Sequence, residues 1–207
     1  AVLYAGGLGT AKDDSEAVKW YKLAAEKGNE FALTNLGVYY FNGTVIPQDQ
    51  PAAFQCFSKA AEKNHAEAQG WMAHCYELGL GVAKDPAQAC AWCEKSARQG
   101  NVFGMNKLGQ YYYAGFGTPK DYAQAQVWLR KAAAGNNSEA QFRLAFMAVQ
   151  GEGVVKDYAE ALRWFQKAAA QNDAGACNWI GVMYHNGWGV TLNHGEAFKW
   201  YTKAANL

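Results

Sequence analysis

The segment GEGVVKDYAEALRW, residues 151–164, decides the fold. It opens with two loop glycines, passes through an aspartate that suits a helix N-cap, and continues as the first turns of an amphipathic helix. Glycine recurs at intervals of 36 residues on both sides of Gly151, with no insertion or deletion, at Gly7, Gly43, Gly79, Gly115 and Gly187. A fixed period of this length is the signature of a stacked-repeat protein.

We therefore expect an all-α fold, a right-handed superhelical solenoid of antiparallel helix hairpins with about six repeats of 36 residues. Residues 1–207 are expected to form a single array. The expected boundaries are a partial first repeat at 1–29, full repeats at 30–65, 66–101, 102–137 and 138–173, and a last repeat at 174–207.

Residues that share one position of the repeat form a column, and three columns predict the first helix of each hairpin. They are spaced i, i+4 and i+8, which places them on one helical face. The small column is Ala32, Ala68, Gly104, Ala140 and Ala176, the large apolar column is Leu36, Met72, Leu108, Leu144 and Ile180, and the tyrosine column is Tyr4, Tyr40, Tyr76, Tyr112 and Tyr184. The recurring glycines follow this helix, where a left-handed residue ends it.

The second helix has its own start and stop signals. The predicted N-caps are Asp13, Asp49, Asp85, Asp121, Asp157 and Asn193. Three residues later, five of the six repeats carry the Glu or Gln of a capping box. The predicted left-handed ends are Gly28, Asn64, Gly100, Asn136 and Asn172. A tryptophan column, interrupted at Cys56, marks the buried stripe: Trp20, Trp92, Trp128, Trp164 and Trp200.

The pattern Ala-x-x-x-Leu-Gly-x-x-Tyr, Gly-x-Gly-Val, Lys-Asp-Tyr, Ala-Leu-x-Trp and Lys-Ala-Ala resembles the Sel-one-like repeats, relatives of the tetratricopeptide repeat. In this chain it stands as Ala140 with Leu144-Ala145, Gly151-Glu152-Gly153-Val154, Lys156-Asp157-Tyr158, Ala161-Leu162-Arg163-Trp164 and Lys167-Ala168-Ala169. The resemblance covers the whole chain, with local departures at Val45, Cys56 and Ala148. It implies an adaptor that holds other proteins together, in bacterial host-interaction and signalling systems or in eukaryotic membrane-protein quality control.

Composition narrows the classes of partner. Lys and Arg number 19 and Asp and Glu 18, a net charge of +1 without a basic run, so nucleic acid is not an expected partner. No apolar run approaches the length of a membrane helix and no secretory signal opens the chain, so direct membrane insertion is not expected. The chain starts at Ala1, within the second half of a helix by the repeat register, and we expect it to be a piece of a longer protein of unknown compartment.

Chemistry-bearing motifs are weak. Cys90 and Cys93 have the CxxC form of redox or half-zinc sites, but no strand precedes them, no second ligand pair follows, and the column of Cys93 is otherwise apolar. We interpret both as reduced, structural cysteines. His74 and His185 lie three repeats apart, too distant to share a metal, and no catalytic triad or carboxylate pair is supported by spacing. The chain is expected to be no enzyme and to need no metal or cofactor.

Cysteine-rich bacterial members of the resembled family staple each hairpin with two cysteines eight residues apart. Cys177 matches one of these positions, but its partner position is Ala169, so the staple is absent. This absence favours a reducing compartment or an array that is stable without crosslinks.

The tetratricopeptide architecture implies that three rows of first-helix positions line a concave face. The rows are Thr34, Gly70, Asn106, Phe142 and Asn178; Val38, His74, Gln110, Phe146 and Val182; and Phe41, Glu77, Tyr113, Val149 and His185. These fifteen positions hold no Lys or Arg and one acid, and without Gly70 and Val149 they are the predicted partner-binding residues. Aromatic and neutral polar groups suit a peptide groove. The alternative is that some of them pack into the tight curve of the superhelix. Arg143 is expected on the outer side.

The leading interpretation is a scaffold that binds a protein or peptide on its concave face. A second interpretation is a spacer or self-assembling segment, which would associate through exposed apolar ends near Tyr4 and Trp200. A third is a hydrolase-type enzyme, as proposed for some cysteine-rich relatives. Convergent titratable groups in one pocket would favour that third interpretation.

Overall fold

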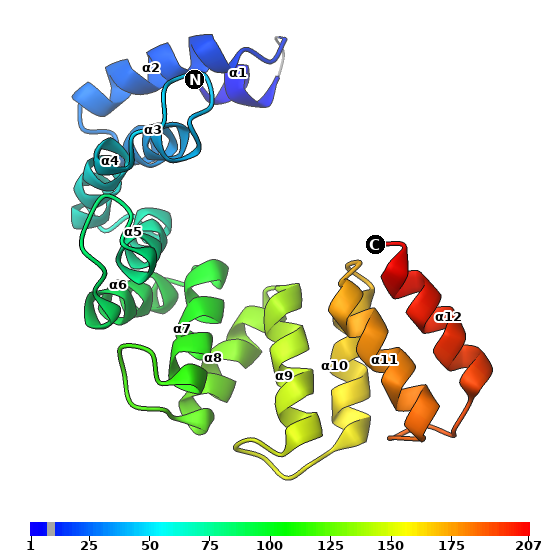
Figure 1. The fold of residues 1–207 in the computed structure, drawn as a ribbon. Coiled ribbons are helices and arrows are strands. Elements are labelled where there is room, and N and C mark those ends of the chain that lie inside the picture. The colour runs from blue at the N-terminus through cyan, green and yellow to red at the C-terminus, as the bar shows by residue number, and fades with distance from the viewer. Residues whose placement is uncertain (8–10) are drawn as a thin grey trace. The chain divides into compact units, whose positions relative to one another are not determined.

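The computed structural model describes residues 1–7 and 11–207, and every regular element in these two ranges is an α-helix. The helices alternate as first and second members of hairpins (Figure 1). The first helices are α1 (Val2–Gly6), α3 (Glu30–Asn42), α5 (Ala66–Leu78), α7 (Val102–Ala114), α9 (Ser138–Gln150) and α11 (Ala174–Asn186). The second helices are α2 (Asp14–Glu26), α4 (Gln50–Glu62), α6 (Pro86–Arg98), α8 (Tyr122–Ala134), α10 (Tyr158–Ala169) and α12 (His194–Ala205). The predicted helical hairpin repeat is confirmed.

Each second helix begins at a side-chain cap, as the sequence predicts. A carboxylate oxygen of Asp121 accepts a hydrogen bond from the Gln124 N–H at 2.9 Å, and the five equivalent caps make the same bond. The expected reciprocal half of the capping box is wrong. The Asp121 N–H donates instead to the carbonyl oxygen of Tyr112 at 2.9 Å, and the other N-caps repeat this bond. A first-helix carbonyl thus replaces the Glu or Gln side chain and ties each loop to its own hairpin.

The helix ends adopt the predicted left-handed conformation. The recurring glycines from Gly7 to Gly187 have φ between 64° and 78°. The second-helix ends from Gly28 to Asn172 have φ between 62° and 86°. Glycine and asparagine are the residues that tolerate this region best, which explains the composition of both columns. Val45 also has a φ of 70°, in the place of a second loop glycine.

Small residues let the two helices of a hairpin approach closely. The alanines of the second-helix column from Ala17 to Ala197 are at most 2% exposed. On the first helix, a Cβ at Gly37 would lie 2.5 Å from a ring atom of Phe57, and one at Gly181 would lie 2.6 Å from the Tyr201 ring. These contacts leave no room for a side chain, so the large apolar residue of one helix fills the space left by the glycine of the other.

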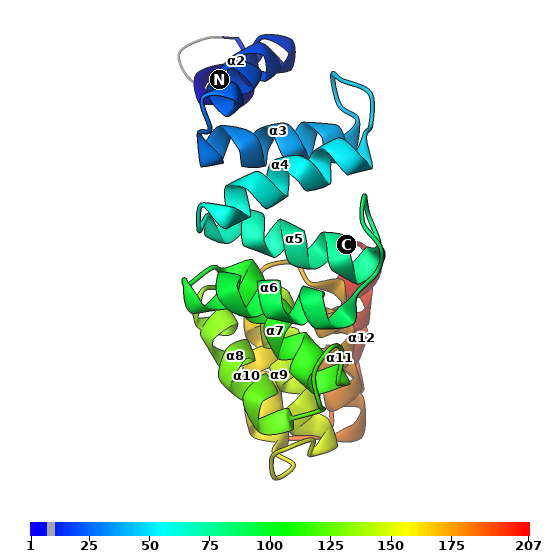
Figure 2. The same ribbon diagram turned by 90° about the vertical axis from the view of Figure 1, so that its left-hand side faces the viewer.

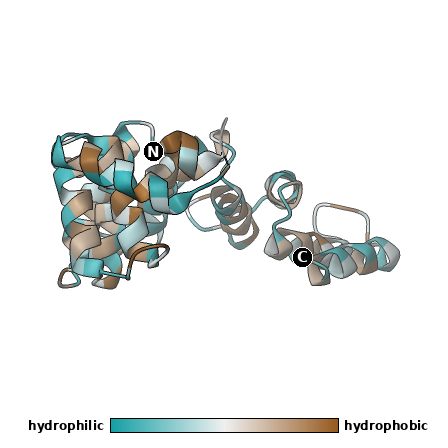
Figure 3. Ribbon diagram, turned by 90° about the horizontal axis from the view of Figure 1, so that it is seen from above, coloured by the Kyte–Doolittle hydropathy of each residue, from teal (hydrophilic) through white to brown (hydrophobic). Residues whose placement is uncertain are grey.

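Contacts divide the chain into two compact units, which are described separately. Unit 1 comprises Ala1–Gly104 with Phe116–Thr118, and α3 to α6 lie in it one after another (Figure 2). Unit 2 comprises Met105–Gly115 with Pro119–Leu207, and its core includes the fully buried Phe165. The ribbons of both units alternate between hydrophilic and hydrophobic colours along their length (Figure 3), as helices with one buried face do.

Buried amides link successive hairpins within each unit, a feature that the sequence columns did not reveal. In unit 1, Gln69 is 2% exposed, donates to Asn64 Oδ1 at 3.1 Å and accepts from Gln99 Nε2 at 2.7 Å. In unit 2, Gln141 is equally buried, donates to the Ala133 carbonyl oxygen of the preceding hairpin at 3.3 Å and accepts from Gln171 Nε2 at 2.9 Å. These hydrogen bonds satisfy amides that would otherwise destabilise the core.

Candidate partner-binding surface

The first row of predicted binding residues is partly closed. Thr34 and Asn106 are each 1% exposed. The Thr34 hydroxyl donates to the Glu30 carbonyl oxygen at 2.8 Å and lies 2.9 Å from His65 Nδ1 at the start of α5. Asn106 Nδ2 donates to a carboxylate oxygen of Glu139 at 2.8 Å. The expectation that these two side chains face an open groove is wrong, because they pack against the following first helix.

Most of the other predicted residues keep part of their surface accessible. Their role in partner binding stays a prediction. Asn178 and His185 are exposed. The partly exposed positions are Val38, Phe41, His74, Glu77, Gln110, Tyr113, Phe142, Phe146 and Val182. Val149, the third-row position of α9, is 4% exposed and belongs to the core.

In unit 1, two of the predicted residues, Phe41 and His74, lie against a tryptophan that was not among the predicted site residues. Trp71 stacks on the buried Phe57 with ring centroids 5.1 Å apart and planes 4° from parallel. Phe41 lies 5.1 Å from the Trp71 ring, and the His74 ring lies 5.9 Å from both. His74 Nδ1 is also 3.5 Å from a carboxylate oxygen of Glu77. The result is an aromatic cluster on α3 and α5 with one acid at its edge.

Unit 2 repeats the arrangement on α9 and α11. Trp179 stacks on the buried Phe165, with centroids 5.8 Å apart and planes 4° from parallel. The Phe146 ring meets Trp179 edge-on at 5.6 Å, and Phe142 lies 5.5 Å from Phe165. Trp71 and Trp179 share one column of the repeat, three repeats apart. The two tryptophans at equivalent positions of the repeat were a signal that the sequence contained.

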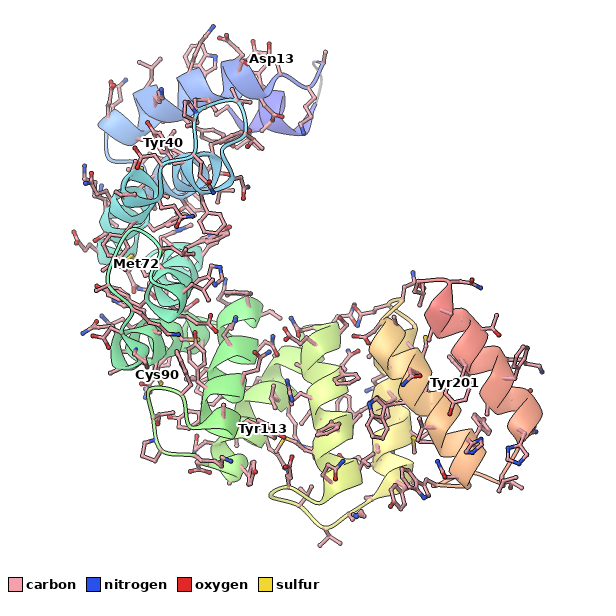
Figure 4. The ribbon with its side chains drawn as sticks, viewed as in Figure 1. Asp13, Tyr40, Met72, Cys90, Tyr113 and Tyr201 are labelled. Atoms are coloured by element: carbon pink, nitrogen blue, oxygen red, sulfur yellow. The ribbon has the colours of Figure 1, made fainter. Side chains whose placement is uncertain are left out.

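Tyr113 anchors a polar network at the loop end of α7 (Figure 4). Its hydroxyl donates to a carboxylate oxygen of Glu152 at 2.6 Å, and its ring lies 5.4 Å from that of Tyr122. Burial, together with the hydrogen bond to Glu152, raises the pKa of Tyr113 to about 12. The phenol therefore remains a hydrogen-bond donor above its ordinary pKa of 10.0.

Arg143 lies against this network, so its predicted place on the outer side is wrong. Its guanidinium carbon is 5.0 Å from the centre of the Tyr113 ring, a cation–π distance. Arg143 occupies the same column as Trp71 and Trp179, and each of these two side chains contacts an aromatic ring of the preceding first helix. Within the described residues, its Nε and the side-chain Nε2 of Gln110 are buried without a hydrogen-bond partner. This end of unit 2 therefore carries unused donors beside an aromatic ring.

Comparison with known families now accounts for the repeat. The Sel1 repeat profile matches residues 1–29, 31–65, 66–101, 102–137, 138–173 and 174–207. The chain belongs to the Sel1 repeat family. Proteins of this family are generally non-enzymatic scaffolds for protein interaction.

Solved structures of Sel1 repeat proteins resemble the chain over almost its full length. A Sel1 repeat protein from Oxalobacter formigenes is 33% identical with a TM-score of 0.90, covering 99% of this chain and 84% of that protein. The protective antigen c5321 of uropathogenic Escherichia coli, which displays the same fold, is 36% identical with a TM-score of 0.85. That match covers 99% of this chain and 44% of the antigen, so the chain spans less than half of the antigen's length. No curated protein sequence matches the chain.

The cysteine-rich branch of the Sel1 repeat proteins is represented by cysteine rich protein B of Helicobacter pylori. It is 28% identical, with a TM-score of 0.50, and the match covers 62% of this chain and 92% of that protein. In this chain all five cysteines are free thiols. Burial raises the pKa of the Cys90 thiol, and the nearby Glu94 carboxylate raises it further. Cys93 is fully buried, with its sulfur 3.2 Å from the Gly104 carbonyl oxygen. Neither thiol is placed as a ready nucleophile.

Metal ions and membranes are two further classes of partner that the side chains and helices bear on. Across residues 1–7 and 11–207, no group of three or more His, Cys, Asp or Glu side chains is arranged to hold a metal ion. In that same part of the chain, no Sel1 helix is both long and apolar enough to cross a membrane.

Proposed function

We propose that this chain is a protein-interaction scaffold and that its second unit binds an extended polypeptide segment along α9 and α11. The observation that carries the proposal is the partly exposed, edge-to-face pair of Phe146 and Trp179. Aromatic side chains at such positions are the usual anchors of protein interfaces. Their partial exposure leaves apolar area that a partner side chain would remove from water.

The anchors are held rigidly. Trp179 stacks on Phe165, which is 0% exposed, so one face of the indole ring packs against the core and its orientation is restricted. A surface that is already ordered loses little conformational entropy on binding. The cluster thus favours a groove that is formed before its partner arrives.

The polar surroundings suit a peptide backbone. Asn178 and His185 are exposed on α11, beside the partly exposed Val182. Amide and imidazole groups can form hydrogen bonds with a peptide backbone. Alternating apolar anchors and neutral hydrogen-bonding groups are typical of sites that read an extended segment.

Peptide selection tests the proposal with a defined ligand. Random peptides displayed on phage are selected on the immobilised chain, and the affinities of enriched peptides are measured by calorimetry. Phe146→Ala is expected to weaken binding by about 2 kcal/mol or more, as the loss of a buried anchor does. Phe146→Leu, which keeps an apolar side chain of similar reach, is expected to recover part of the loss.

The matched control is Phe198→Ala, because Phe198 is 72% exposed on the second helix α12 of the same unit. This truncation is expected to leave binding nearly unchanged. Each variant must first show unaltered helical content and melting. Peptides whose binding survives Phe146→Ala but is lost in Phe198→Ala would place the site on the second-helix side and refute the proposal.

A further inference from the structure

The second helices carry a repeated contact between an indole and an ammonium group. In four repeats a lysine lies three residues after the column tryptophan with its Nζ over the indole ring. The pairs and their distances to the ring centre are Lys95–Trp92 at 3.9 Å, Lys131–Trp128 at 4.2 Å, Lys167–Trp164 at 4.3 Å and Lys203–Trp200 at 5.2 Å. Tryptophan is the aromatic side chain that a cation prefers, so each pair is a cation–π contact.

The second repeat keeps the lysine and lacks the indole. Lys59 stands in the lysine column, while Cys56 replaces the tryptophan. Cys56 packs at the edge of a core cluster that contains Tyr21 and Leu36. The small thiol reaches less far than an indole would, and the space beside it is open.

That space is a pocket of about 400 Å³ formed by α2, α3 and α4. Its lining includes Ala25, Leu33, Leu36, Tyr40, Cys56 and Lys59. Leu33 and Leu36 are 4% and 6% exposed, so the floor belongs to the core of unit 1. A volume of this size lies within the range of ligand pockets.

The rim of the pocket is polar. Lys22 and Glu26 of α2 and Gln55 of α4 contribute to the lining beside the apolar floor. The Glu26 carboxylate and the Gln55 amide oxygen are acceptors that suit an indole N–H. The pocket thus combines an apolar floor, the cations Lys22 and Lys59, and hydrogen-bond acceptors.

We infer that this pocket binds the indole side chain of a tryptophan from a partner polypeptide, which takes the place that Trp92 and its equivalents occupy in the other repeats. The indole would fill the space beside Cys56 with the Lys59 ammonium over its ring, as in the four intact pairs. The site lies in unit 1 on the second-helix side. It is thus separate from the surface of α9 and α11 and does not depend on it.

N-acetyl-L-tryptophanamide is the probe, because it presents the side chain with a peptide group on either side. Titration into the isotope-labelled chain is followed by nuclear magnetic resonance. Saturable shifts are expected at Leu33, Leu36 and Tyr40, with a dissociation constant on the order of 1 mM or tighter for a ligand of this size. N-acetyl-L-leucinamide, which lacks the ring, is expected to cause no saturable shift there.

Two variants separate the pocket from other apolar surfaces. Cys56→Trp restores the column, and is expected to abolish binding of the probe and to raise the melting temperature by about 2–4 °C. Lys59→Met keeps the apolar stem but removes the cation, and is expected to weaken binding about two- to fivefold. Phe146→Ala, in the other unit, is expected to change nothing.

The titration of the unaltered chain decides the matter even if Cys56→Trp fails to fold. The inference is overturned if no saturable shift appears at the pocket residues up to about 10 mM probe, well above the expected range. It is also overturned if the shifts persist in a folded Cys56→Trp variant. Binding of free indole without binding of N-acetyl-L-tryptophanamide would exclude a polypeptide as the source of the ring and overturn it too.

Discussion

Replacing Gly117 with alanine tests how one hairpin fits onto the next. A Cβ at Gly117 would lie 1.9 Å from the carbonyl oxygen of Pro86 at the start of α6. Two residues earlier, a Cβ at Gly115 would lie no closer than 3.3 Å to any neighbouring atom, the Lys120 nitrogen. The two glycines have φ of 68° and 72°, so alanine suffers the same left-handed strain at both positions. Only at Gly117 would the added Cβ also clash with the backbone of α6.

The expected losses follow from these geometries. Alanine in the left-handed region costs about 1–2 kcal/mol, which is the whole expected effect of Gly115→Ala. At Gly117 the loop must also move away from α6, and forced overpacking adds about 1–3 kcal/mol. Gly117→Ala is therefore expected to lower the free energy of unfolding by about 2–5 kcal/mol in total.

Urea denaturation followed by circular dichroism measures both variants against the unaltered chain. A second pair in unit 2 repeats the comparison: a Cβ at Gly153 would lie 2.4 Å from the Tyr122 Cβ, and one at Gly151 no closer than 3.5 Å to any neighbour. Gly153→Ala is thus expected to cost more than Gly151→Ala. Equal losses within both pairs would show that the second loop glycine makes no tight contact with the preceding hairpin, and would refute the packing described above.

Three further predictions concern caps, strain and pH. Asp121→Ala is expected to cost about 0.5–2 kcal/mol in urea denaturation, because the Gln124 N–H loses its acceptor, and Asp121→Asn is expected to cost less; equal losses would mean that the charge matters rather than the bond. Val45→Gly is expected to stabilise the chain by about 1 kcal/mol or more, since a β-branched residue is strained at a φ of 70°; an unchanged urea midpoint would contradict this. The pKa of Tyr113 is raised from 10.0 to about 12, so its contribution to stability is complete below pH 10 and declines as the pH rises toward 12. The difference in free energy of unfolding between the unaltered chain and Tyr113→Phe should therefore shrink over that window, and a constant difference would show that the phenol has an ordinary pKa.

The repeat, its helices and its caps were predictable from the sequence because each depends on local chemistry. Glycine and asparagine tolerate the left-handed region best, and an N-cap needs a short side chain with an acceptor, so these positions show as recurring residue types at fixed spacing. The reciprocal capping bond was predicted wrongly because its actual acceptor does not depend on residue type. The Tyr112 carbonyl, which accepts the Asp121 N–H, is a backbone group and leaves no trace in the sequence.

The candidate site was less predictable because exposure of a first-helix residue depends on three neighbours: its own second helix and the first helices before and after it. Thr34 was expected to be open, but it meets His65 of the following repeat. Arg143 was expected on the outer side, but it lies over Tyr113 of the preceding first helix. A single column cannot show this, since the contact joins two different columns of adjacent repeats.

The columns of the repeat differ in how much their residue types vary along the chain. The alanine column from Ala17 to Ala197 does not vary along the chain and is buried throughout, so it can only serve the fold. The column of Trp71 and Trp179 also contains Asn35, Lys107 and Arg143, five positions with four different residue types. Packing alone does not select among an amide, two cations and an indole at equivalent places. The same backbone position therefore presents an aromatic side chain in some repeats and a polar or charged group in others. Under the proposed function, an extended partner on unit 2 would meet Lys107, Arg143 and Trp179 in that fixed order.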